Sequence, residues 1–83
     1  MNKTTKKAIE EKVQRDMVID NLKRLLKNME AADKGVIVQM YKSEFNGFLN
    51  ASIIMKAITP TERDAFLADM YRIDNSKIGV AYM

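Results

Sequence analysis

The chain has 83 residues, of which 30% are charged, a formal net charge of +3, and neither histidine nor cysteine. The two absences exclude a histidine general base, the commonest metal ligand, a thiolate nucleophile and a disulfide framework. The length allows one domain that buries about 60–65% of its unfolded surface, so a partner or a second copy is a ready source of added stability.

The first predicted element is a long amphipathic helix from about residue 5 to residue 34. Its apolar residues recur at steps of mostly three and four. The clearest seam follows a 4-3-4-3 pattern through Val18, Leu22, Leu25, Met29 and Ala32. Acid-first pairs four residues apart, such as Glu11 with Arg15, favour the same helix. Gly35 is predicted in the left-handed conformation just past the helix end.

This helix is too long for its own domain. About 30 residues at 1.5 Å each give roughly 45 Å, whereas a compact domain of this size is roughly 30 Å across. The excess is expected to fray at its basic start, to break, or to pack on a second molecule. We therefore predict self-association or partner binding through Val18, Leu22, Leu25 and Met29.

Residues 36–49 predict a second helix, although the β-branched run from Val36 to Val38 also fits a short strand. Gly47 costs about 1 kcal/mol inside a helix. It therefore predicts a bend or a close helix approach near residues 46–50. Asn50 fits the cap of a short third helix over residues 51–58.

The segment Thr59-Pro60-Thr61-Glu62 is the sharpest local signal and predicts the start of the last helix. The Thr59 hydroxyl is expected to accept a hydrogen bond from the Glu62 amide, and the Glu62 carboxylate one from the Thr59 amide. Pro60 has no N–H to lose at the first helical position. The predicted inward side carries Phe66, Leu67, Met70, Tyr71 and Ile73. The helix is expected to end around residues 74–76.

The apolar tail at residues 78–83 is expected to be covered by the core, with Ile78 and Tyr82 as anchors, or by a partner. Together these elements predict an all-α fold of three to four helices in a single domain, residues 1–83, with a basic, frayed start at residues 1–7. The long N-terminal helix is expected to pack on a compact C-terminal helical unit. No segment has the 18 or so apolar residues of a membrane span. Because Ile9-Glu10-Glu11-Lys12 replaces the apolar part of a signal peptide, we expect a cytoplasmic protein.

No catalytic residue, cofactor site or metal site is predicted. Paired carboxylates such as Asp16 and Asp20 lie beside lysines and arginines, which lower a carboxylate pKa instead of raising it toward neutrality. Three isolated glycines cannot form a nucleotide-binding loop, and the serines have no histidine partner. We expect a protein without enzymatic activity and without a cofactor.

The basic residues suggest an alternative function. Residues 1–35 carry nine basic and six acidic side chains, whereas residues 36–83 carry five of each. The candidates for binding an anion are Lys3, Lys6, Lys7, Lys23, Arg24 and Lys27. So few phosphate contacts predict weak, salt-sensitive binding to nucleic acid. The interleaved acids and the neutral C-terminal half count against this alternative.

The seven methionines fit either core filling or an adaptable binding surface. Lys, Asn, Ile and Met form more than a third of the chain, a bias typical of AT-rich coding in phages and mobile elements. We expect a small regulator or inhibitor that binds another protein through helical apolar surfaces and forms a homo-oligomer. A small nucleic-acid-binding protein that uses its basic N-terminal helix is the alternative.

Overall fold

A computed structural model describes residues 3–77, with side chains described from residue 5 onward. These residues form three helices: α1 (Lys3–Ala31), α2 (Gly35–Ile54) and α3 (Pro60–Ser76). The described part of the chain is all-helical and has no strand. Two predictions concern residues beyond it: the first residues of the basic start, and the apolar tail with Ile78 and Tyr82.

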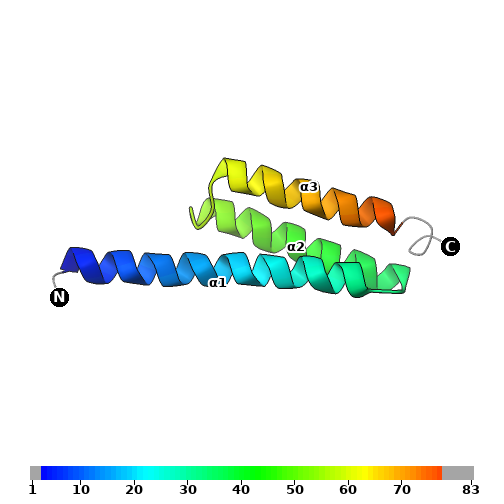
Figure 1. Cartoon of the computed structure of the whole chain (residues 1–83), viewed down its shortest axis with the longest axis horizontal. Helices are drawn as coiled ribbons and strands as arrows, with labels where there is room; N and C mark the ends of the chain where they lie inside the picture. The colour runs from blue at the N-terminus through cyan, green and yellow to red at the C-terminus, as the bar shows by residue number, and fades with distance from the viewer. Residues whose placement is uncertain (1–2, 78–83) are drawn as a thin grey trace.

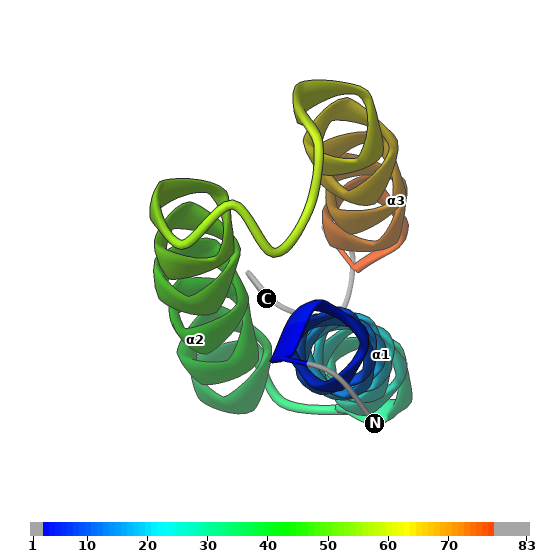
Figure 2. The ribbon, with the colours of Figure 1, turned by 90° about the vertical axis from the view of Figure 1, so that its left-hand side faces the viewer.

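The three helices pack side by side as a small bundle. In Figure 1, α2 runs back along the C-terminal half of α1, and α3 returns in the direction of α1. The end-on view in Figure 2 places the three helices at the corners of a triangle. All three pairs of helices are in contact, and α1 with α2 is the most extensive pair. The predicted all-α bundle is therefore confirmed.

The molecule is elongated because α1 is longer than the helices that cover it. Its extents are 57 × 19 × 15 Å and its radius of gyration is 15.3 Å, against about 12 Å for a compact chain of this length. The N-terminal part of α1 projects beyond the α2–α3 connection (Figure 1). Every described side chain from Thr5 to Met17 is exposed.

The core lies between the C-terminal part of α1 and the inward faces of α2 and α3. Its fully buried large side chains come from all three helices: Leu22, Met29, Val38, Phe45, Met70 and Ile73. The rings of Phe45 and Phe66 meet edge to face, with centroids 6.4 Å apart and planes at 61°. Such a pair is favoured because the positive ring edge faces the negative ring face.

The prediction for Gly35 is wrong. Helix α1 ends at Ala31, and Gly35 begins α2 without a positive φ. The backbone N–H of Ala32 donates to the carbonyls of Asn28 and Met29 at 3.1 and 3.3 Å, which closes α1. Lys34 is extended, with φ −123° and ψ 138°, and precedes α2. Three residues, 32–34, are enough to reverse the chain, so no glycine-based cap is needed.

The predicted break in α2 is also wrong. Residues 36–38 are helical, not extended, and Asn50 lies inside α2 instead of capping a third helix over residues 51–58. The reason is that the buried positions of α2 continue at helical spacing past Gly47: Val38, Phe45, Leu49 and Ser52. The chain turns only after Ile54, where Lys56 adopts a left-handed φ of 58°.

The prediction for the start of α3 is confirmed. Thr59 Oγ1 accepts a hydrogen bond from the Glu62 backbone N–H at 3.1 Å, and Glu62 Oε1 accepts one from the Thr59 N–H at 2.9 Å. Pro60 occupies the first helical position. The helix ends at Ser76, within the predicted range. None of the helices within residues 3–77 combines the length and the hydropathy that a bilayer crossing demands.

Candidate protein-binding surface

The residues predicted to bind a partner lie in the core of the chain itself. Val18 is 7% exposed, Leu22 0%, Leu25 2% and Met29 0%. They form the side of α1 that packs on α2 and α3. A surface for another molecule must therefore be sought elsewhere on the helices.

The overhanging part of α1 carries a second apolar row. Ile9, Val13 and Met17 follow one another at steps of four and are 49%, 53% and 67% exposed. Four residues rotate a helix by about 40° beyond a full turn, so the row drifts around α1 toward α2. The positions four and seven residues before Val18, which continue the core seam toward the N-terminus, are the polar residues Gln14 and Glu11. The exposed row is therefore separate from the core face.

Arg15 lies between Val13 and Met17 and ties α1 to α3. Its Nη2 lies 2.6 Å from Oε2 of Glu62, which joins α1 to the first turn of α3. The backbone N–H of Thr59 holds the pKa of the Glu62 carboxyl below its ordinary value, and the Thr59 hydroxyl and Arg15 act in the same direction. The predicted partner of Arg15, Glu11, lies one turn earlier on the same helix. Glu62 on α3 takes its place.

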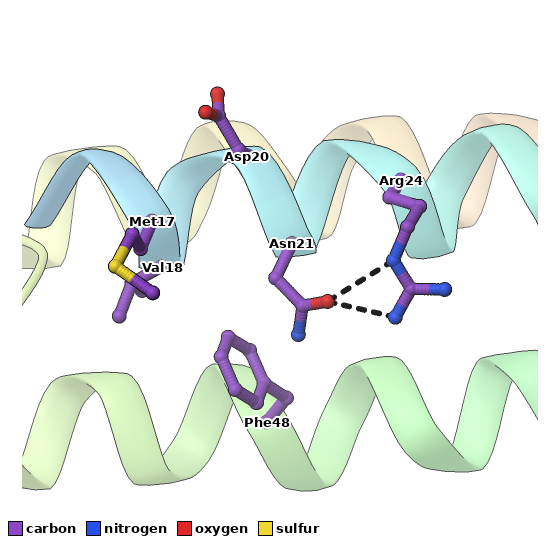
Figure 3. A pocket seen from close by; sticks show the side chains of 6 residues that line it. All are labelled: Met17, Val18, Asp20, Asn21, Arg24 and Phe48. Carbon is purple, nitrogen blue, oxygen red and sulfur yellow. Dashed lines mark hydrogen bonds between the residues drawn. The ribbon is translucent and has the colours of Figure 1, made fainter. Parts of the chain in front are cut away.

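The apolar row leads into a groove between α1 and α2. The groove has a volume of about 480 Å³. It is lined by Met17, Val18, Asp20, Asn21, Arg24 and Phe48. Figure 3 shows the Phe48 ring pointing from α2 toward α1, while Asp20 points away from α2. The end near Met17 and Val18 is apolar, and the end near Arg24 is cationic.

Arg24 is held in place at the polar end of this groove. Its Nε and Nη2 donate to Oδ1 of Asn21 at 3.2 and 2.7 Å (Figure 3). A guanidinium has five N–H donors, so Arg24 retains donors for another acceptor. A carboxylate is the strongest such acceptor in a protein. The groove therefore fits an apolar side chain flanked by an acidic one.

The six residues predicted to bind an anion do not form one patch. Lys6 and Lys7 lie on the overhang, and Lys23, Arg24 and Lys27 lie on the part of α1 that covers the bundle; all five are exposed. The side chain of Lys3 is outside the described residues. From Lys7 to Lys23 the helix rises by roughly 24 Å. Asp16 and Asp20, both exposed, lie between the two groups.

The outward face of α2 is a second exposed apolar surface, which the sequence reasoning missed. Val36 is 77% exposed, Met40 48% and Ile54 75%. Small or polar exposed residues lie between them on this face: Ser43, Gly47, Asn50 and Ala51. The steps of three and four from Val36 through Met40, Ser43 and Gly47 were the available signal.

Gly47 has no role within the chain that explains it. A Cβ built at this position meets nothing within 4 Å, and no described glycine has a positive φ. Alanine is better than glycine in a helix interior by about 1 kcal/mol. In the isolated chain Gly47 therefore destabilises α2 relative to alanine, and no contact within the chain offsets this loss.

No group of three or more Asp or Glu side chains within the described residues is arranged to hold a metal ion. The exposed apolar row, the groove and the outward face of α2 are the candidate binding surfaces considered below. No protein-family model, no curated protein and no solved structure matches the chain.

Proposed function

We propose that the chain is a non-enzymatic regulator or inhibitor that binds another protein along Ile9, Val13 and Met17. One observation carries the proposal: these three side chains form an exposed apolar row on a helical segment that the core does not use. An amphipathic helix that offers residues at steps of four is a common way to bind a partner groove or helix.

The groove beside Phe48 continues this surface from an apolar end to a basic end. A partner that follows the row from Ile9 reaches Met17, whose flexible thioether adapts to different shapes. It then meets the apolar end of the groove and, further along, the guanidinium of Arg24. The proposed partner therefore carries apolar side chains at helical spacing, with an acidic residue at the end near Arg24.

We propose regulation or inhibition because the described residues supply exposed apolar contacts and fixed charges. Such a surface would act on a partner protein by occupying one of its surfaces. Burying the exposed half of each of three side chains contributes roughly 1 kcal/mol apiece. Because association itself is costly, this row needs the groove contacts to reach useful affinity.

The experiment compares capture by three immobilised proteins: the wild type, the Val13→Glu variant and the Gln14→Glu variant. Both substitutions place one negative charge on the exposed overhang, but only Val13 lies in the row. We expect one protein from the host extract to bind the wild type and Gln14→Glu and to be lost with Val13→Glu. The same set of bound proteins on all three would contradict the proposal.

Nucleic-acid binding is the alternative, supported by the exposed cluster of Lys23, Arg24 and Lys27. Asp20 is interleaved with this cluster and lowers its attraction for phosphate. Retention on heparin that disappears at moderate salt in the wild type, and at low salt in a Lys23→Glu/Lys27→Glu variant, would favour this alternative.

A further inference from the structure

We infer that α2 pairs with α2 of a second copy of this chain, antiparallel and about a two-fold axis at Gly47. The inference uses the outward face of α2, defined above by Val36, Met40, Ser43, Gly47, Asn50, Ala51 and Ile54. It does not depend on the α1 row, because no residue is shared between the two surfaces.

The residues along this face are placed symmetrically about Gly47. Met40 lies seven residues before Gly47, and Ile54 lies seven residues after it. Ser43 and Ala51 lie four residues before and after it. A two-fold axis at Gly47 in an antiparallel pair therefore sets Met40 against Ile54 of the copy and Ser43 against Ala51. Large side chains meet at both ends, and small ones meet at the centre.

Gly47 at the centre of this face also fits a closely packed helix pair. The position where its Cβ would lie is open within the chain, so this glycine gives no packing advantage to the isolated bundle. Between two helices, the absence of a Cβ allows the backbones to approach closely, as small residues four apart do in helix pairs. Ser43, Gly47 and Ala51 are such a series. The second copy is the surface that makes use of it.

The charge and the apolar exposure of this face also suit a second copy. The face contains no basic residue, and Glu44 at its edge lies three residues before Gly47, opposite Asn50 of the copy. Met40 is 48% exposed and Ile54 is 75% exposed, and each faces the other across the proposed axis, so the pair removes apolar surface from water at both ends of the contact. A two-fold pair uses the same patch on both subunits, so no other partner chemistry is needed to cover this face.

The test uses single-cysteine variants, which are unambiguous because the chain has no cysteine of its own. A disulfide requires Cα atoms within about 7 Å. In the proposed pair, Ser43 faces Ala51 of the copy, whereas the two Ser43 residues lie roughly 12 Å apart along the axis. A mixture of Ser43→Cys and Ala51→Cys chains, one of them tagged, should therefore cross-link under mild oxidation. Neither variant alone should do so.

Two outcomes would overturn the inference. Cross-linking of Ser43→Cys with itself as fully as with Ala51→Cys would show that the pair is parallel or that its axis does not lie at Gly47. No cross-linking at a chain concentration of about 0.5 mM would show that this face does not associate even where mass action favours it.

A charge at the axis gives an independent measurement on the same protein. Gly47→Glu places two carboxylates against each other, and sedimentation equilibrium should show a dimer dissociation constant at least about a hundredfold higher. Ala68→Glu makes a similar small-to-Glu change at an exposed position of α3 and should change the constant less than about twofold. Circular dichroism verifies that both variants remain helical. Equal association of Gly47→Glu and the wild type would refute the two-fold at Gly47.

Discussion

Removing the Thr59 hydroxyl should lower the free energy of unfolding through the loss of one hydrogen bond at the start of α3. In the structure this hydroxyl accepts the Glu62 backbone N–H at 3.1 Å. In Thr59→Ala that N–H turns to water, while the reciprocal bond from the Thr59 N–H to Glu62 Oε1 needs no hydroxyl and is retained. The loss is therefore one capping bond, about 1 kcal/mol.

This loss should appear in global unfolding. Helix α3 supplies Met70 and Ile73 to the core, each 1% exposed, so α3 does not detach without opening the bundle. For a domain of 60–100 residues, 1 kcal/mol lowers Tm by about 4–8 °C. Thermal and urea unfolding followed by circular dichroism should both report it.

The matched control is Thr61→Ala, two residues further along the same helix. Thr61 is exposed and takes no part in the capping box, so its replacement should change stability by less than about 0.5 kcal/mol. Thr59→Ser retains the acceptor and should unfold close to the wild type. Equal unfolding midpoints for Thr59→Ala and Thr61→Ala would show that the Thr59 hydroxyl contributes nothing to the cap.

Three further outcomes are expected. Phe45→Ala removes a side chain that is 0% exposed and contacts Phe66; a cost of about 3–5 kcal/mol should leave much of the chain unfolded in urea that the wild type tolerates. The lowered pKa of Glu62 stabilises the fold at pH above its ordinary value of 4.5, and this contribution is lost as the pH falls below 4.5 through the lowered value. In a plot of the urea unfolding midpoint against pH, Glu62→Gln should therefore show a smaller fall on the acid side than the wild type. An equal fall in both proteins would exclude this role. Amides of residues 5–13 should exchange far faster than those of residues 22–29, as hydrogen exchange by NMR can measure, because the overhang lacks tertiary burial.

The capping box was predictable because its chemistry is local. Thr59, Pro60 and Glu62 are close in sequence, and the bonds among them do not depend on the rest of the fold. The ends of the other helices were not predictable in this way. Gly35 and Asn50 both suit helix ends by local preference, but the buried series of α2 extends across Asn50, and packing outweighs a cap worth about 1 kcal/mol.

The role of the α1 seam was not predictable from periodicity. Spacing shows that Val18, Leu22 and Met29 share one side of a helix, but not whether that side is covered by the same chain or by another. The structure places α2 and α3 over it. The same periodicity did not reveal the exposed row. Ile9 and Val13 share the helical spacing of the core residues, and only their position around the axis of α1 separates them from the core.

Neither the bend nor the close approach expected at Gly47 occurs within the described residues. Helix α2 continues through Gly47 to Ile54, so there is no break at that residue. No described helix of the chain approaches Gly47 either, because a Cβ built there meets nothing within 4 Å; approach by a second copy is the proposal made above.

The proposed function requires the apolar row Ile9, Val13 and Met17 of α1 to bind a partner protein. The most direct measurement is calorimetric titration of the captured partner with the wild type, Val13→Glu and Gln14→Glu. We predict that Val13→Glu weakens binding by more than about a hundredfold and that Gln14→Glu stays within about threefold of the wild type. Equal affinities for all three proteins would contradict the claim.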